Sequence, residues 1–143
     1  MREVKRAALV DRPPGEMFAL INDIESYPSF LPWCTHARIE SRAADCLVAT
    51  IGVRQGSLAG EFTTRNTFTD EHRITMRLLR GPFRQLDGEW LLTGIPGGGC
   101  RIELTMRFAF GNPLTAMLFE SKFAHTVGSL VDAFVARARG SHP

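Results

Sequence analysis

The stretch Tyr27–Cys34, with the sequence YPSFLPWC, separates a short amphipathic segment from a long series of alternating segments. Its two prolines, four residues apart, exclude both a regular helix and a central strand. The stretch nevertheless carries four large apolar side chains, those of Tyr27, Phe30, Leu31 and Trp33. Apolar groups of this size on an irregular connection are expected to cover something apolar. That is either the protein's own core, as a packed lid, or the wall of a ligand cavity.

Before this lid, the sequence predicts a strand followed by a helix. Glu3–Val10 is expected to form the first strand, and Pro13 and Pro14 open a helix because proline suits the first helical turn. The apolar residues of that helix share one face at helical spacing: Met17, Leu20, Ile21 and Ile24.

After the lid, apolar and polar residues alternate with a period of two. Every second residue from Cys100 to Phe110 is apolar, and most residues between them are polar. The segments 62–68, 74–78 and 86–92 follow the same pattern. One dry face and one wet face are typical of strands in an antiparallel sheet, so we expect six strands in this part of the chain.

The last segment predicts a long helix that begins at Asn112, a good N-cap, with Pro113 in the first helical position. Its apolar stripe consists of Phe119, Phe123, Val127, Leu130, Val131 and Phe134. A curved sheet has to bury its dry face, and this helix is the one long enough to cover it. The sequence therefore predicts an α+β fold in which about seven antiparallel strands curve around a long C-terminal helix, with one or two short helices after the first strand.

Length and composition fit one domain over residues 1–143, with no linker or repeat. The net charge of +2, from 17 basic and 15 acidic residues, does not indicate nucleic-acid binding by itself, and no DNA partner is expected. The apolar stretch Ala7–Val10 is too short for a secretory signal, and no apolar run would span a bilayer. We therefore expect a cytoplasmic protein, with transient contact at the inner face of the membrane.

Five motifs, in this order, resemble a known family. They are Tyr-Pro-x-Phe-Leu-Pro-x-Cys at 27–34, Phe-Thr-Thr-Arg-Asn at 62–66, Gly-Pro-Phe at 81–83, Leu-x-Gly-x-Trp at 86–90 and Cys-Arg-Ile-Glu at 100–103. From about Val4 to Arg139, the chain is similar to the coenzyme-Q-binding START-like family (polyketide cyclase/dehydrase and lipid transport), which includes bacterial ribosome-association toxins of the RatA type. The resemblance implies the helix-grip fold of START and Bet v 1-like proteins.

The resemblance also implies a hydrophobic guest between sheet and helix, namely ubiquinone or a related lipid, bound without catalysis in support of respiratory electron transport. No other cofactor is expected. The residues expected to bind it are Tyr27, Phe30, Leu31, Trp33, Phe62, Asn66, Phe68, Met76, Phe83, Trp90, Met106, Phe108, Phe119, Glu120 and Phe123. The mouth of the cavity is expected at the lid and at Leu58, Pro82 and Phe83. A core in which the same aromatic side chains interdigitate remains the alternative.

The sequence offers no catalytic set. No Ser-His-Asp or Cys-His arrangement stands out, no metal-ligand spacing is present, and Cys34, Cys46 and Cys100 are expected to be buried free thiols. Asn66 and Glu120 interrupt the apolar pattern. Each is either satisfied locally, Glu120 by exposure near the helix start, or faces a guest. A cyclase or dehydratase is the remaining enzymatic alternative.

A third hypothesis concerns arginines that point outward from the strands: Arg65, Arg73, Arg77, Arg101 and Arg107, with Arg84 close by. Such a set can contact RNA phosphates, as a toxin that binds the large ribosomal subunit and blocks subunit joining would require. Glu61, Asp87, Glu89 and Glu103 share that face, so a salt-bridged solvated surface is the competing interpretation.

Overall fold

The computed structural model describes residues 1–140. Within them the chain forms β1 (Arg2–Val10), α1 (Pro14–Asn22), the 3-10 helix η1 (Ile24–Ser29), β2 (Cys34–Arg42), β3 (Cys46–Gln55), β4 (Leu58–Thr69), β5 (Arg73–Arg80), β6 (Phe83–Gly94), β7 (Cys100–Phe110) and α2 (Pro113–Gly140). The element order and the fold class predicted from the sequence are confirmed. None of the helices in this part of the chain has the length and apolar character needed to cross a bilayer.

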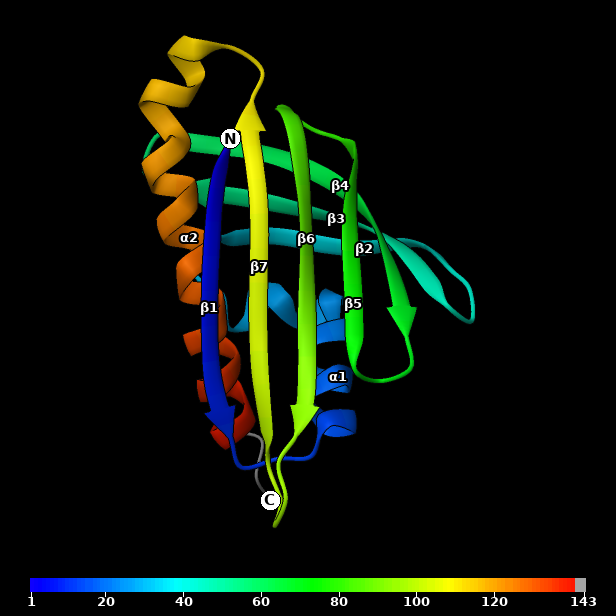
Figure 1. The fold of residues 1–143 in the computed structure, drawn as a ribbon. Helices are drawn as coiled ribbons and strands as arrows, with labels where there is room; N and C mark the ends of the chain where they lie inside the picture. Colours follow the sequence, from blue (N-terminus) through cyan, green and yellow to red (C-terminus); the bar gives the residue numbers. More distant parts are fainter. Residues whose placement is uncertain (141–143) are drawn as a thin grey trace.

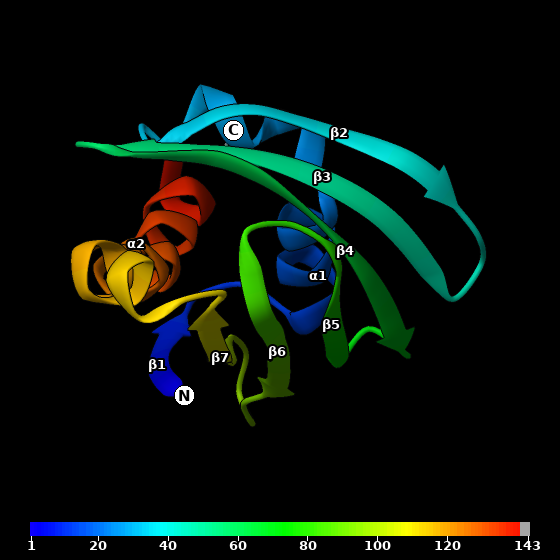
Figure 2. The same ribbon diagram turned by 90° about the horizontal axis from the view of Figure 1, so that it is seen from above.

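The seven strands form one antiparallel sheet in the order β1-β7-β6-β5-β4-β3-β2. The sheet curves strongly, so that β2, β3 and β4 cross behind the other four strands in the view of Figure 1. Figure 2 shows α1 inside this curve and α2 along its open side. The arrangement is a sheet that grips a C-terminal helix.

The core lies on the concave face of the sheet, as the period of two predicts. Every second residue of β7 is buried: Cys100, Ile102, Leu104, Met106, Phe108 and Phe110. Ile74, Leu86, Trp90 and Leu92 continue the same surface on β5 and β6. The two-residue repeat of each strand thus becomes one continuous apolar layer once the strands pair.

Helix α2 begins where its capping residues require. The side-chain oxygen of Asn112 accepts a hydrogen bond from the backbone N–H of Thr115 at 2.8 Å, which satisfies one of the free donors of the first turn. The predicted stripe turns inward, since Phe123 and Phe134 are buried while Phe119 is half-buried. Burial of this face against β1 and β7 holds the helix on the sheet.

The lid is more regular than its two prolines suggest, because Pro28 lies inside η1. Leu31 is fully buried, and the buried hydroxyl of Tyr27 donates to the carbonyl oxygen of Ile21. Phe30 packs edge-on against Phe134 with ring centroids 5.5 Å apart. The lid therefore covers the second half of α2.

Candidate functional site

The aromatic rings expected to line a cavity near the start of α2 pack against one another. Phe123 contacts Phe108 at 4.7 Å and Phe83 at 4.9 Å between ring centroids. Phe62 contacts both Phe83 and Phe123, and Phe110 stacks on Phe83 at 4.8 Å. At this end of the helix, the space between sheet and α2 is filled by side chains, as in the interdigitated alternative.

The structure does not bring the two parts of the expected mouth together. The lid packs on Phe134, whereas Phe83, expected at a loop tip but found at the start of β6, packs on Phe123. These two helix positions are 11 residues apart, which corresponds to roughly 16 Å along the axis. Leu58, also expected at a loop tip, is the first residue of β4 and is buried. The lid and Phe83 thus close two different ends of the core.

The middle of the core is also filled, around Trp90, one of the residues expected to bind the guest. A Cβ atom at Gly88 would overlap the Sδ of Met106 and lie 3.1 Å from the Cε of Met76. The long side chains of two neighbouring strands already occupy that space. Trp90 itself is 3% exposed and lies edge-on to Phe134 at 5.4 Å.

Of the two polar residues in the apolar pattern, Asn66 faces inward and Glu120 does not. Asn66 is 7% exposed, and its carbonyl oxygen accepts a hydrogen bond from the Thr64 hydroxyl at 2.7 Å. Its carbonyl is thus satisfied within the protein. The carboxylate of Glu120 lies 3.6 Å from the guanidinium of Arg2, and its side chain is 36% exposed. Glu120 near the start of α2 turns toward β1 and solvent, which corrects its expected place in the cavity.

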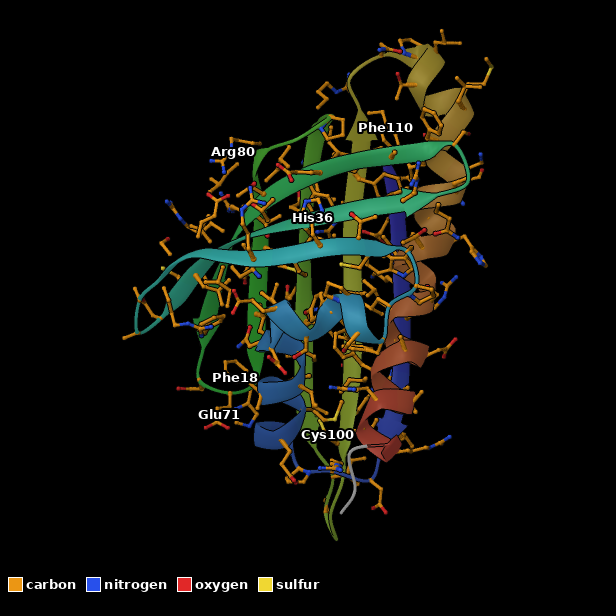
Figure 3. The ribbon with its side chains drawn as sticks, turned by 180° about the vertical axis from the view of Figure 1, so that it is seen from behind. Phe18, His36, Glu71, Arg80, Cys100 and Phe110 are labelled. Atoms are coloured by element: carbon orange, nitrogen blue, oxygen red, sulfur yellow. The ribbon has the colours of Figure 1, made fainter. Side chains whose placement is uncertain are left out.

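A groove of about 950 Å³ lies elsewhere, between α1, the β2–β3 turn and the β4–β5 turn. We call it the α1 groove. Its apolar wall contains Phe18 and Leu20 of α1 and Phe68 of β4. Phe18 and Phe68 meet edge-on at 5.3 Å. Its polar rim consists of Arg12, Glu16, Asn22, Asp23, Arg42, Asp45, Asp70 and Glu71. Figure 3 shows Phe18 and Glu71 at this end of the molecule.

Of the residues that line the α1 groove, the sequence predicted Phe68 as a binding residue and did not predict the others. Phe18 follows Met17, which lies on the inward face of α1. The signal in the sequence that could have identified Phe18 is a large aromatic ring next to that face. Arg12 was missed as well. One of its terminal nitrogens binds Glu16 at 3.1 Å, but its Nε and Nη2 atoms are buried without a hydrogen-bond partner among the described residues.

The outer, convex face of the sheet carries the arginines expected there, and all five are exposed. Three are neutralised by carboxylates. Arg107 binds Glu3 at 2.9 Å and Asp87 at 3.5 Å. Arg73 pairs with Glu89 at 2.5 Å, and Arg101 pairs with Glu103 at 3.4 Å. For these three, the salt-bridged interpretation is correct.

Arg65, Arg77 and Arg84 have no ion-pair partner within residues 1–140. Arg65 and Arg77 are direct partners across β4 and β5. The β5–β6 ladder ends at the pair Arg77 and Asp87, and beyond it a groove of about 540 Å³ opens between the two strands. Arg77, Arg84 and Arg107 line this β5–β6 groove together with the carboxylates of Asp87 and Glu89.

A second polar network covers the outer face over β2, β3 and β4. Nη2 of Arg80 binds the carboxylate of Glu40 at 2.7 and 2.9 Å, and the Thr50 hydroxyl donates to the same carboxylate. These hydrogen bonds lower the pKa of Glu40, and the bond from Thr50 has the largest effect. His36 lies 2.6 Å from Glu61, and this hydrogen bond lowers the pKa of Glu61.

The three cysteines are unpaired, with Cys34 and Cys100 buried and Cys46 half-buried. Burial raises the pKa of the Cys34 thiol to about 11 and also raises that of Cys100. Both are therefore protonated near neutral pH and are poor metal ligands. Residues 1–140 contain no cluster of three His, Cys, Asp or Glu side chains that would hold a metal ion.

The chain matches known proteins along most of its length. A family model described as polyketide cyclase / dehydrase and lipid transport matches residues 10–135. The ribosome association toxin RatA of Escherichia coli is 37% identical over 139 residues, which cover 97% of this chain and 88% of that protein. The mitochondrial coenzyme Q-binding protein COQ10 of Dictyostelium discoideum is 23% identical over 87% of this chain and 63% of that protein.

A solved START superfamily protein from Mycobacterium smegmatis has a similar fold, with a TM-score of 0.83 at 15% identity. The similarity covers 98% of this chain and 99% of that one. At this identity the likeness concerns the fold, which it identifies as START-like.

Proposed function

The chain belongs to the polyketide cyclase / dehydrase and lipid transport family, and from that premise we propose that it associates with the ribosome. The observation that carries the proposal is the 37% identity to the ribosome association toxin RatA over 97% of this chain. The match spans the whole curved sheet and α2 rather than one motif. We infer further that the partner is the large ribosomal subunit and that binding involves no turnover.

The outer face supplies a surface suited to RNA. Arg65, Arg77 and Arg84 are exposed and lack ion-pair partners among the described residues. An arginine without a carboxylate partner can give its donors to phosphate oxygens without first breaking a salt bridge. Arg73 and Arg101 lie on the same face but are already paired. The proposal therefore narrows the RNA-contacting set to the three unpaired arginines.

Co-sedimentation with purified large ribosomal subunits over a range of salt concentrations tests both statements. The wild-type protein should sediment with the subunits, and binding should fall steeply as salt rises. A triple variant, Arg65→Gln with Arg77→Gln and Arg84→Gln, should bind more weakly. The slope of log K against log salt should become shallower by about 2, because roughly 0.7–0.9 counterions are released per phosphate contact.

The matched control carries Arg73→Gln and Arg101→Gln, two changes on the same face that remove paired arginines. It should keep nearly all of the wild-type affinity and salt slope. A wild-type protein that stays at the top of the gradient would refute ribosome association. A triple variant that sediments like wild type would leave the association standing but would refute this surface.

A second candidate function is the binding of a hydrophobic guest such as ubiquinone or a related lipid, and the α1 groove favours it. Its volume of about 950 Å³ lies within the range of small-molecule sites, and Phe18, Leu20 and Phe68 give it an apolar wall. The 23% identity to a coenzyme Q-binding protein supports the same chemistry. Native mass spectrometry of protein purified from its own host should reveal a bound lipid, and organic extraction should recover it. Protein without any such guest would argue against this candidate.

A further inference from the structure

The start of α2 exposes an unusual group of apolar side chains. Leu114, Met117 and Leu118 are 62%, 76% and 53% exposed, and Met1 beside them is 66% exposed. Met1 lines the same shallow hollow as Pro113 and Ala116 of the first helical turns. Figure 1 shows these turns rising past the ends of the strands. We call Leu114, Met117 and Leu118 the α2 tip.

The α2 tip occupies one side of the helix. At 3.6 residues per turn, its three side chains fall within an arc of about 100°, on the side opposite Phe123. Phe123 is buried in the core, so the tip points away from the sheet. Single exposed apolar residues are common, but three on two successive turns form a patch that is mostly exposed to solvent.

The surroundings of the α2 tip are positively charged. Arg84 and Glu120 line the hollow beside the first turn, and Arg2 lies 3.6 Å from Glu120. Lys122 follows Leu118 by one turn, with its ammonium 5.9 Å from the ring centre of Phe119. Arg2 and Glu120 thus neutralise each other, whereas Arg84 and Lys122 near the first turns of α2 have no ion-pair partner among the described residues. The positive end of the helix dipole adds to this potential.

We propose that the α2 tip inserts into the interface of an anionic lipid bilayer. A projecting apolar patch within a basic rim matches such a surface, where apolar side chains enter the acyl boundary and Arg or Lys side chains meet lipid phosphates. A second copy of the chain fits less well. Three side chains fall far short of the ~800 Å² per partner that a stable dimer interface buries. The proposal does not depend on ribosome association.

Vesicle co-sedimentation tests the proposal, with vesicles of phosphatidylcholine alone and with added phosphatidylglycerol. The wild-type protein should bind the anionic vesicles and bind the neutral ones much more weakly. The triple variant Leu114→Gln with Met117→Gln and Leu118→Gln should lose at least about tenfold in affinity. Because these side chains are exposed, the variant should keep the wild-type melting temperature.

Leu9→Gln is the matched control, because Leu9 is 65% exposed at the far end of β1. This variant should bind vesicles like wild type. The proposal is overturned by a wild-type protein that binds neither kind of vesicle, and equally by a tip variant that binds as well as the control. Gel filtration tests the competing occupant of the patch, a second copy of the chain. A wild-type dimer that the tip substitutions convert to a monomer would assign the patch to a second copy and refute the membrane.

Discussion

Arg65 and Arg77 face each other as direct partners on β4 and β5, and neither has an ion-pair partner in residues 1–140. Like charges placed directly opposite on neighbouring strands destabilise a sheet. Arg107, two strands from Arg77, binds two carboxylates. Asp87 is the partner of Arg77 on β6 but forms its ion pair with Arg107. The repulsion between Arg65 and Arg77 is therefore not relieved by an ion pair, and binding of an anion would offset its cost.

The first prediction is that Arg65→Thr stabilises the free protein. Removal of one charge from the pair should raise the free energy of unfolding by about 0.2–1 kcal/mol at low salt. The gain should shrink at high salt, because the repulsion is screened. Urea denaturation at two salt concentrations measures it. Arg73→Thr is the control, since it breaks the pair with Glu89 and should bring no comparable gain. An Arg65→Thr variant that is less stable than wild type at low salt would contradict the interpretation.

The second prediction concerns the contact between lid and helix. Phe134 is 1% exposed and touches the rings of Tyr27, Phe30 and Trp90. Phe134→Ala should lower the free energy of unfolding by about 3–5 kcal/mol, as for other buried phenylalanines. Phe30→Ala should cost less than half of that, because its ring is half-buried. Equal losses in the two variants, measured by urea denaturation, would show that the lid is buried more deeply than the structure indicates.

The third prediction tests the filled space beside Trp90. Gly88→Ala should destabilise the protein by about 1–3 kcal/mol, because the new methyl group overlaps Met106 and lies 2.9 Å from the carbonyl oxygen of Thr105. Gly60→Ala is the control, since its Cβ would meet only Pro82 at 3.9 Å. Thermal melts of the two variants give the comparison. A fully tolerated Gly88→Ala would point to free room in the core beside Trp90, as a guest cavity there would require.

Local pattern predicted the elements well. The period of two on 100–110 and the stripe around Phe123 come from single strands and a single helix, which is why a sequence reveals them. Prediction of the candidate site would have required the register between strands and the curvature of the sheet. The residues near Gly88 in the sequence do not indicate that Met106 fills the space beside it. The residues near Phe83 do not indicate how far Phe83 lies from the lid. The sequence alone also does not place Arg65 opposite Arg77, because this pairing depends on the β4–β5 register.

The fourth prediction is a pH dependence at Glu40. Hydrogen bonds from Thr50 and Arg80 lower the pKa of this carboxyl in the folded protein. Its contribution to stability is therefore complete above the pKa of the unfolded chain and disappears as the pH falls through the lower folded value. Glu40→Gln should be less stable than wild type at neutral pH, and the difference should shrink below about pH 4. Urea denaturation across this range measures it. A difference that stays constant with pH would assign the effect to packing rather than charge.

The last prediction tests whether a quinone enters the α1 groove. Phe68 of its wall, Ile74 and Trp90 are successive partners across β4, β5 and β6, so Phe68 and Trp90 lie about 10 Å apart. A bound quinone should therefore quench Trp90, and a Trp33→Phe background isolates that signal. In this background, Ala19→Glu places a carboxylate in the apolar part of the groove and should abolish quenching by a soluble ubiquinone analogue. Ala136→Glu makes the same change on an exposed turn of α2 outside the groove and should leave quenching intact. Equal quenching in both variants would place the quinone elsewhere, and its absence in the parent would remove the quinone as the guest of this groove.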